Sequence, residues 1–378
     1  MTAPLRILVM AEAPFGAGGS GAEAGLDGQV AGLRARGHRV VVICAKQVRA
    51  DAGVEVRAVG WSALTPWRAR AAALPDLARG VVDAIVLHHP LPGLVLLAAA
   101  RRARVPVIAL VHSPWRDEYL VRRPDASARR RALGALRHRI EHRVLTRVDR
   151  VYALSRFMAD RVAAAHGLPA AAVAVNPGGV DRARFAPPAD RAAARRRLGL
   201  PAEAPVLFCL RNLEPRMGVD VLLDAMPAVR ARHPDVLLVV GGRGPLAAPL
   251  RARAAALGLE GAVRFTGFLP DAELPAWFGA ADASVLPTQH MEGFGLVTVE
   301  SLACGTPVVA TPVGATPEIL APLDPALLAD GAGAEALARA ILALLARPDR
   351  EALGARGREH TSRYAWAAYA ERLEAMLA

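Results

Sequence analysis

Short apolar runs recur along the chain and are separated by segments with helical spacing of apolar residues. In the first part of the chain, residues 29–36 place Val30 and Leu33 on one face of a predicted helix. The apolar runs predict strands at residues 5–10, 39–44, 54–59, 84–87, 107–111 and 150–154. A strand–helix–strand start of this kind predicts a parallel sheet with helices on both faces.

A second series of the same kind begins at Pro205. Its predicted strands are residues 206–210, 236–241, 263–266, 283–286 and 308–310. Its predicted helices lie near residues 219–233, 245–257, 274–280 and 334–346, and a last helix covers 364–377. Between the two series, residues 173–185 are rich in turn formers and predict a linker. We therefore expect an α/β protein with two Rossmann-like domains, residues 1–182 and 187–360.

Composition supports two globular cores, since 53% of the 378 residues are hydrophobic and 22% are charged. The three cysteines, Cys44, Cys209 and Cys304, are far apart in apolar runs, which predicts reduced core thiols and no metal site. No apolar run has the length of a signal peptide or of a membrane span. These features favour a cytoplasmic protein.

The net charge is +12, and Lys46 is the only lysine, so arginine supplies nearly all of the positive charge. Many of these arginines lie between Arg101 and Arg150. One interpretation is a solvated helix face, and another is peripheral contact with an anionic membrane, at its inner face, or with a phosphorylated acceptor. A third, a nucleic-acid-binding module, is not favoured because the segment lacks interleaved aromatic residues and a recognition motif.

Residues 288–311 contain the most informative pattern in the chain. Glu292 and Glu300 flank the turn 293–295, and an apolar helix pattern starts at Leu296. Such a turn at a helix start exposes backbone N–H groups and the positive end of the helix dipole, which together bind anions. Roughly 12 Å at most would separate the two glutamates along a helix. That span suits a sugar nucleotide, with a diphosphate between two hydroxylated rings.

A glycine-rich loop, residues 16–21, directly follows the first predicted strand. Glycines let the backbone approach phosphate oxygens closely. The loop is not a Walker motif, because no Gly-Lys-Ser/Thr follows, and it is not a clean G-x-G-x-x-G, because no helix is expected directly after it. By itself it fits a phosphate loop and a plain surface loop equally well.

Two arginines and a histidine also follow predicted strands. Arg211 and Arg216 come after the strand at 206–210, where ligands bind in parallel sheets, and an arginine fork suits phosphate. His112 ends the strand at 107–111 and can hydrogen bond a sugar hydroxyl.

The segment 115–119 carries a tryptophan, a tyrosine and two carboxylates, which suit a polyol, although a loop packed against its own domain explains them equally well. His88 and His89 end another strand and are weaker candidates for the same site.

The stretch from Glu292 to Ala310 resembles the E-x7-E signature of the retaining glycosyltransferases of family 4, and departs from it mainly at Ser301 and Cys304. Residues 211–218 resemble that family's G-R-x-x-x-x-K-G motif, with Arg216 in place of lysine and one additional residue before the glycine. Further similarity lies at His112 and in the segments LSRFM (154–158) and NPGGVD (176–181). The resemblance implies the GT-B fold, in which two Rossmann-like domains face each other across a cleft.

In that family the first domain binds the acceptor, the second binds the donor, and a terminal helix, here within 362–378, packs back on the first domain. The implied catalytic residues are His112, Arg211, Arg216 and Glu292. The implied donor-binding residues are Gly18, Gly19, Arg211, Arg216, Gly242, Leu269, Glu292, Gly293, Phe294, Gly295, Leu296 and Glu300. The family also has an acidic residue at the position of Glu318, where a structural role at a helix start is an equal alternative.

The resemblance implies hexosyl transfer, with retained configuration, from a UDP- or GDP-sugar to a hydroxyl of a lipid, glycan or small natural product. No Asp-x-Asp metal motif is evident, so we expect no metal and no cofactor. One alternative is a nucleotide-sugar epimerase of the same fold, and another is an arginine-rich nucleic-acid-binding module. The sequence leaves the donor sugar, the base, the acceptor and the linkage open.

Overall fold

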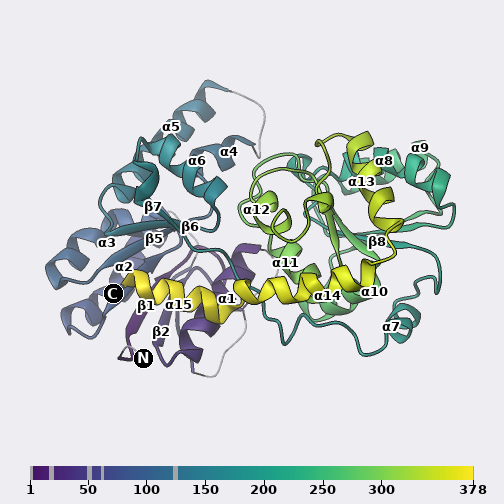
Figure 1. Ribbon diagram of the computed structural model, residues 1–378. Helices are drawn as coiled ribbons and strands as arrows, with labels where there is room; N and C mark the ends of the chain where they lie inside the picture. The colour runs from purple at the N-terminus through teal and green to yellow at the C-terminus, as the bar shows by residue number, and fades with distance from the viewer. Residues whose placement is uncertain (1–2, 17–20, 49–52, 61–63, 122–126, 378) are drawn as a thin grey trace. The chain divides into compact units, whose positions relative to one another are not determined.

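The computed structural model describes residues 3–16, 21–48, 53–60, 64–121 and 127–377 (Figure 1). The chain divides into two compact units, residues 1–179 with 366–378, and residues 180–365. The expected domain boundaries, 182 and 187, lie a few residues beyond the division after Gly179.

The first unit is built on a seven-stranded parallel sheet in the order β3-β2-β1-β4-β5-β6-β7. Its strands are β1 (Arg6–Met10), β2 (Arg39–Cys44), β3 (Glu55–Ala58), β4 (Ala84–Leu87), β5 (Val107–Val111), β6 (Arg150–Ala153) and β7 (Val173–Val175). The predicted strands are confirmed within one residue at each end. The strand β7 is not predicted, because its three residues lie inside the turn-rich stretch 173–185, for which the sequence predicts a linker.

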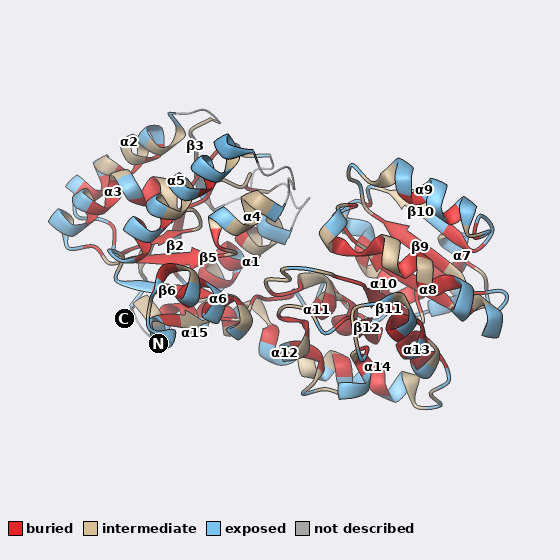
Figure 2. Cartoon of the chain, turned by 90° about the horizontal axis from the view of Figure 1, so that it is seen from above, coloured by how far each residue is buried: buried red, intermediate tan, exposed pale blue. Residues whose placement is uncertain are grey.

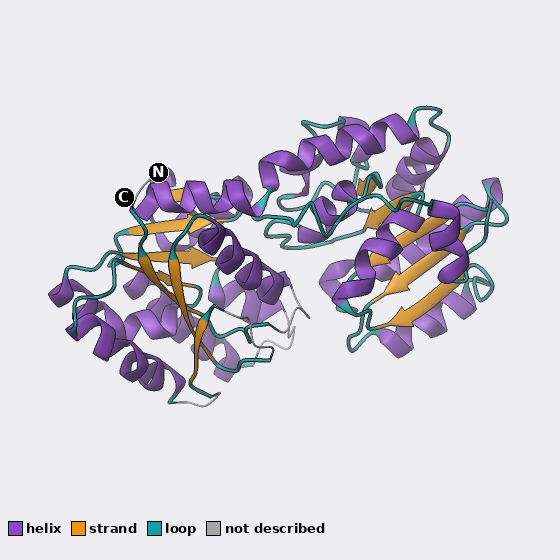
Figure 3. Ribbon diagram, turned by 90° about the horizontal axis from the view of Figure 1, so that it is seen from below, coloured by secondary structure: helices purple, strands orange, loops and turns teal. Residues whose placement is uncertain are grey.

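Helices cover both faces of this sheet (Figure 3). They are α1 (Gly21–Ala35), α2 (Thr65–Ala78), α3 (Pro90–Ala103), α4 (Trp115–Val121), α5 (Ala128–Leu145), α6 (Arg156–His166) and α15 (Trp366–Leu377). Residues of α2, α3 and α6 belong to the core on one face, and residues of α1 and α15 to the core on the other. The terminal helix thus belongs to the first unit.

The first helix is longer than the predicted segment 29–36, and it begins at the end of the glycine loop, where no helix was expected. Its internal glycines lower the helix propensity of this segment, so the sequence does not predict the first part of the helix. A Cβ at Gly28 would lie 2.0 Å from the Trp366 ring, and one at Gly32 would lie 2.6 Å from the Trp366 carbonyl oxygen. These glycines are therefore what lets α15 pack directly on α1.

The last helix begins at Trp366, two residues later than predicted. Tyr364 instead ends a 3-10 turn, Thr361–Tyr364, which belongs to the second unit. The chain therefore passes between the units twice, after Gly179 and after Ala365.

The second unit has a five-stranded parallel sheet in the order β10-β9-β8-β11-β12. Its strands are β8 (Val206–Leu210), β9 (Leu237–Gly241), β10 (Val263–Gly267), β11 (Ala283–Leu286) and β12 (Val308–Ala310). Its helices are α7 (Arg191–Arg197), α8 (Val219–Arg232), α9 (Ala247–Ala256), α10 (Leu274–Ala280), α11 (Leu296–Ala303), α12 (Thr316–Leu320), α13 (Ala334–Leu345) and α14 (Arg350–His360). Apart from β10, the strands are almost entirely buried, which explains why continuous apolar runs predicted them to within a residue (Figure 2).

All three cysteines are buried and free, as predicted. Burial raises the pKa of both Cys209 and Cys304 to about 12, so neither is a thiolate near neutral pH. No helix in the described ranges is long and apolar enough to cross a bilayer.

Candidate active site

Glu292 is held at the start of the candidate site by its own backbone. Its carbonyl oxygen accepts a hydrogen bond of 2.9 Å from the Ala315 N–H. A Cβ at Gly314 would lie 2.5 Å from that same oxygen, so only glycine lets the two segments approach this closely. The preceding residue, Met291, has a φ of 56°, which is uncommon outside glycine. The glutamate is therefore seated by a tightly specified turn.

The Glu292 carboxylate forms a compact cluster with Arg211 and Thr288. Arg211 Nη2 lies 3.0 Å from Glu292 Oε2 and donates to Thr288 Oγ1 at 2.9 Å. Thr288 Oγ1 is 3.3 Å from Glu292 Oε2. Arg211 is only 7% exposed, and within the described part of the chain its buried Nε has no hydrogen-bond partner. A buried donor of this kind is normally satisfied, and an anionic ligand would satisfy it.

Arg216 reaches the same turn from the 3-10 turn Pro215–Met217. Its Nη1 donates to the Met291 carbonyl oxygen at 3.3 Å, and its Nε lies 3.7 Å from the Glu214 carboxylate. Gly218 follows with a φ of 69°, and a Cβ there would lie 1.9 Å from the Pro287 carbonyl oxygen. The structure therefore brings both predicted arginines to the segment that carries Glu292.

The helix α11 begins directly after the Gly-Phe-Gly turn, as predicted. Gly295 caps it with a φ of 87°, and Val299 and Leu302 are fully buried beneath it. The first N–H groups of α11 have no acceptor within the helix. They point outward from its N-terminal end, which is the positive end of the helix dipole.

Glu300 lies in the second turn of α11 and is partly buried. Burial raises the pKa of its carboxyl group to about 7, while Arg184 opposes the rise and Asp271 adds to it. This glutamate therefore changes charge near neutral pH, in contrast to an ordinary surface carboxylate.

Gly242 and Leu269 support the arginine cluster. Gly242 has a φ of 128°, and a Cβ there would lie 1.8 Å from the Arg211 carbonyl oxygen, so this glycine lets the Arg211 loop close onto β9. Leu269 is buried, and its Cδ1 packs against Gly241. Contact of either residue with a nucleotide stays a prediction. Gly18 and Gly19 lie outside the described residues, and Glu318 is exposed in the first turn of α12.

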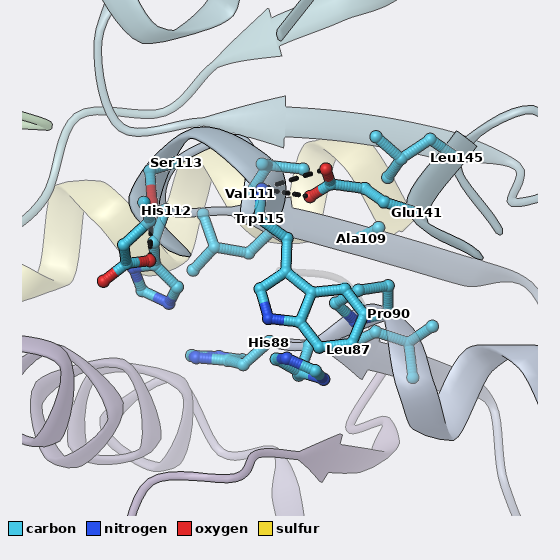
Figure 4. A pocket seen from close by; sticks show the side chains of 13 residues that line it. Leu87, His88, Pro90, Ala109, Val111, His112, Ser113, Trp115, Glu141 and Leu145 are labelled. Carbon is cyan, nitrogen blue, oxygen red and sulfur yellow. Dashed lines mark hydrogen bonds between the residues drawn. The ribbon is translucent and has the colours of Figure 1, made fainter. Parts of the chain in front are cut away.

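A cavity of about 90 Å³ in the first unit contains His112 (Figure 4). Its polar and aromatic lining comes from His88, His89, His112, Ser113, Trp115, Glu118 and Glu141. The His88 and His112 rings lie 5.5 Å apart between centroids, and His89 packs edge-on against Trp115 at 4.6 Å. Burial lowers the pKa of both His88 and His112, so both imidazoles are neutral at pH 7. All three histidines named from the sequence thus meet in one pocket.

The loop that follows His112 is held by Glu141, which the sequence analysis missed. Both carboxylate oxygens of Glu141 accept a hydrogen bond from the backbone N–H of Trp115, at 3.0 and 3.2 Å (Figure 4). His166 Nε2 lies 3.0 Å from one of these oxygens. Arg137 stacks over the Tyr119 ring at 3.9 Å. The available signal for Glu141 was a single acidic residue within the basic helix α5.

This geometry suits an anionic, hydroxyl-bearing ligand in the second unit and a polyol in the first. Two arginines and a helix start supply positive potential, whereas Glu292 and Glu300 supply hydroxyl acceptors. Among the residues that the structure describes, no three His, Cys, Asp or Glu side chains form a group that could hold a metal ion.

Comparison with known proteins decides the family. Residues 19–184 match the model of Glycosyltransferase Family 4, and residues 190–360 match that of Glycosyl transferases group 1. The D-inositol 3-phosphate glycosyltransferase of Thermobispora bispora is 37% identical over 305 residues, which cover 78% of this chain and 70% of that protein. The chain belongs to glycosyltransferase family 4. The predicted family and the GT-B fold class of this family 4 protein are thereby confirmed.

Another relative of this family 4 protein is the GDP-mannose-dependent alpha-(1-6)-phosphatidylinositol monomannoside mannosyltransferase of Mycolicibacterium smegmatis. It is 41% identical over 218 residues, and the match spans only 56% of each protein. Among solved structures, sucrose-phosphate synthase from Thermosynechococcus elongatus has a TM-score of 0.77 at 23% identity, with 98% of both chains covered. Anabaena HepE in complex with UDP and glucose also has a TM-score of 0.77, at 21% identity and 99% coverage of both chains. These structural similarities support the fold.

Proposed function

We propose that this protein transfers a sugar from a nucleoside diphosphate sugar to an acceptor hydroxyl, with retention of configuration and without a metal ion. The observation that carries the proposal is the cluster of Arg211, Thr288 and Glu292, with Arg216 beside it and the start of α11 next in sequence. Similarity to a GDP-mannose-dependent enzyme and to a structure holding UDP makes both GDP- and UDP-sugars candidate donors.

In the proposed reaction, the bond between the anomeric carbon and the diphosphate oxygen breaks, and the acceptor oxygen bonds to that carbon on the same face. The acceptor proton passes to the departing phosphate oxygen. Arg211, Arg216 and the first N–H groups of α11 stabilise the charge that develops on the diphosphate. Glu292 binds hydroxyls of the donor sugar and Glu300 binds those of the ribose, while neutral His112 hydrogen bonds a sugar hydroxyl.

The acceptor in this proposal is a polyol or a glycolipid headgroup, as the names of two relatives suggest. The pocket around His112 supplies imidazole acceptors and the indole of Trp115, a combination that suits a hydroxylated ring. No cofactor takes part, because the nucleoside diphosphate sugar is itself a substrate.

The experiment that tests the proposal is thermal stabilisation by UDP, GDP and ADP, each with EDTA and with excess magnesium. A ligand that binds only the folded protein stabilises it by mass action and so raises its melting temperature. At a ligand concentration of a hundred times Kd, the added free energy of unfolding is about 2.7 kcal/mol. We expect one nucleotide to stabilise the protein equally in EDTA and in magnesium. Stabilisation that needs magnesium would contradict metal independence, and none from any nucleotide would contradict the donor site.

The two alternative functions make different predictions. An epimerase of the same fold would convert the nucleotide sugar with no acceptor present, whereas a transferase would need the acceptor. A nucleic-acid-binding module would bind with strong salt dependence and would turn over no nucleotide sugar. The family match supports neither alternative.

Replacing Arg216 by alanine is expected to weaken binding of the nucleoside diphosphate by about 10- to 100-fold, because a hydrogen bond to a charged group contributes about 1.5–3 kcal/mol. Binding of the nucleoside alone should change much less. Isothermal titration with the diphosphate and with the nucleoside measures the difference. Arg216→Lys, which retains the charge, should recover part of the affinity, and equal losses for both ligands would show that Arg216 does not contact the diphosphate.

We further propose that the helix α5 rests on an anionic membrane surface. Its exposed side includes Leu133 and Leu136, which are 40% and 52% exposed. Exposed arginines of the same helix are Arg129, Arg131, Arg139 and Arg143. Arginines attract anionic headgroups, and exposed leucines among them can enter the membrane interface. A glycolipid acceptor would be reached from this position.

Replacing Arg129, Arg139 and Arg143 by glutamine is expected to weaken binding to vesicles of phosphatidylglycerol and phosphatidylcholine about 100-fold, since each basic residue near such a surface contributes about 1 kcal/mol. Vesicle sedimentation measures the affinity of each variant for these vesicles. The control replaces three exposed arginines of the second unit, Arg196, Arg197 and Arg232, and so removes the same charge. Equal losses in both variants would attribute binding to net charge and not to α5.

A further inference from the structure

Gln29 is a fully buried polar side chain that the proposed reaction does not use. It lies on α1, and its Oε1 is hydrogen bonded to Nε2 of His88, one of the two neutral histidines of the pocket in Figure 4. A buried glutamine costs free energy unless its amide is satisfied, so this contact needs a reason.

The contact specifies the tautomer of His88. An amide oxygen can only accept a hydrogen bond, so Nε2 of His88 must carry the hydrogen. The imidazole is neutral, since burial and the neighbouring His112 both hold its pKa well below the ordinary value. The other ring nitrogen, Nδ1, therefore has no hydrogen and is an acceptor. Within the described ranges, no residue donates a hydrogen bond to it.

A pair of buried tyrosines lies beside Gln29. Tyr152 of β6 and Tyr369 of α15 share a hydrogen bond of 2.8 Å between their hydroxyls. Burial raises the pKa of Tyr152 well above its usual value, Tyr369 raises it further, and the Gln29 side chain opposes the rise. The Gln29 amide nitrogen has no hydrogen-bond acceptor among the described residues, and its oxygen is the atom that lies against His88.

The tyrosine pair is itself fixed by the terminal helix. Asn176 Nδ2 donates to the Tyr369 carbonyl oxygen at 3.2 Å, and Arg372 Nε donates to Asn176 Oδ1 at 2.8 Å. These hydrogen bonds join Tyr152, Tyr369, Asn176 and Arg372 in one polar chain. Buried networks of this kind hold one arrangement, because each alternative leaves a polar group unsatisfied.

We propose that Gln29 is a positioning residue for acceptor binding: it holds His88 in the Nε2-protonated form, so that Nδ1 accepts a hydrogen bond from an acceptor hydroxyl beside His112. The inference rests on the proposed transferase function for its substrate. It assigns His88 a contact with the acceptor and Gln29 an indirect role through that histidine. Other titratable groups around the histidines are Glu118, which faces His112, and Glu12, which pairs with His89.

The first test reads the tautomer directly and needs no activity. The full-length protein, labelled with ¹⁵N-histidine, is examined by NMR between pH 5.5 and 8, and His88 is assigned with a His88→Gln variant. We expect its Nδ1 to show the shift of an unprotonated nitrogen and its Nε2 that of a protonated one throughout. The opposite tautomer, or titration of His88 near its ordinary pKa, would overturn the inference even if transfer is observed.

The second test separates positioning from structure. Gln29→Leu should raise the acceptor KM about three- to tenfold, the value of one neutral hydrogen bond, and leave the donor KM unchanged. Gln29→Glu should place a carboxylate on His88 and make it an imidazolium, so that the acceptor KM improves as pH rises. An unchanged acceptor KM in a folded Gln29→Leu protein would overturn the role. Failure of the transferase proposal appears separately, as absence of nucleotide stabilisation.

Discussion

Replacing Glu292 by glutamine is expected to lower kcat for sugar transfer about 10²–10³-fold, the usual cost of removing one polar group that acts on the transition state. Glutamine keeps the size of the side chain and an oxygen for Arg211, which now lies 3.0 Å from the carboxylate. The charge is lost, so the donor sugar is held less firmly and Arg211 has no ionic partner. Steady-state kinetics with the donor identified by thermal shift measure the effect.

The fold should survive this change, at a cost of about 1–3 kcal/mol for weakening one buried charged hydrogen bond. Circular dichroism and the melting temperature verify that. The matched control is Glu351→Gln, an exposed glutamate in the first turn of α14 in the same unit, which should leave kcat unchanged and cost at most about 1 kcal/mol of stability. Full activity of Glu292→Gln would remove Glu292 from the proposed reaction.

Replacing Gly314 by alanine is expected to cost about 2–5 kcal/mol of stability, although the residue carries no side chain. Two penalties add: about 1–2 kcal/mol for a left-handed backbone at its φ of 67°, and about 1–3 kcal/mol for overpacking. The new Cβ would lie 2.5 Å from the Glu292 carbonyl oxygen, so the turn that seats Glu292 must move. We expect transfer to fall along with the melting temperature, which scanning calorimetry measures.

Gly258→Ala provides the control for this second prediction. Gly258 has nearly the same φ, 66°, but a Cβ there would meet nothing within 4 Å. The variant should therefore show only the conformational penalty of about 1–2 kcal/mol and normal activity. If both alanine variants lose the same stability and Gly314→Ala remains fully active, the close approach to Glu292 does not matter.

The sequence predicted strands far better than it predicted the elements that cover them. Strands such as β4 and β5 are buried on both faces, so each is a continuous apolar run in the sequence, and the strand ends where that run ends. By contrast, α1 carries glycines at positions that face Trp366, a residue more than 300 positions later. Local propensity argues against a helix there, and only the tertiary contact explains it.

The same division separates the two parts of the candidate site. Short segments that follow strands and resemble family motifs carry Arg211, Arg216 and Glu292. The structure brings these three residues together. Gln29 has no local signal, and Glu141 has only its place as the one acidic residue of a basic helix. Each contacts a partner distant in sequence, His88 for Gln29 and Trp115 for Glu141. Buried polar side chains of this kind become visible only once the packing is known.

The place of α15 in the first unit reverses the usual order of folding during synthesis. Residues 180–365 form one unbroken stretch, so the second unit can complete itself as soon as it has left the ribosome. The first unit, although made earlier, waits for the helix Trp366–Leu377 to fill the face of α1 beside Gly28 and Gly32 (Figure 1). Until then an apolar surface and the hydroxyl of Tyr152 stay uncovered. A chain truncated after Ala365 would therefore have every residue of the second unit and an incomplete first unit, the one on which a chaperone would act.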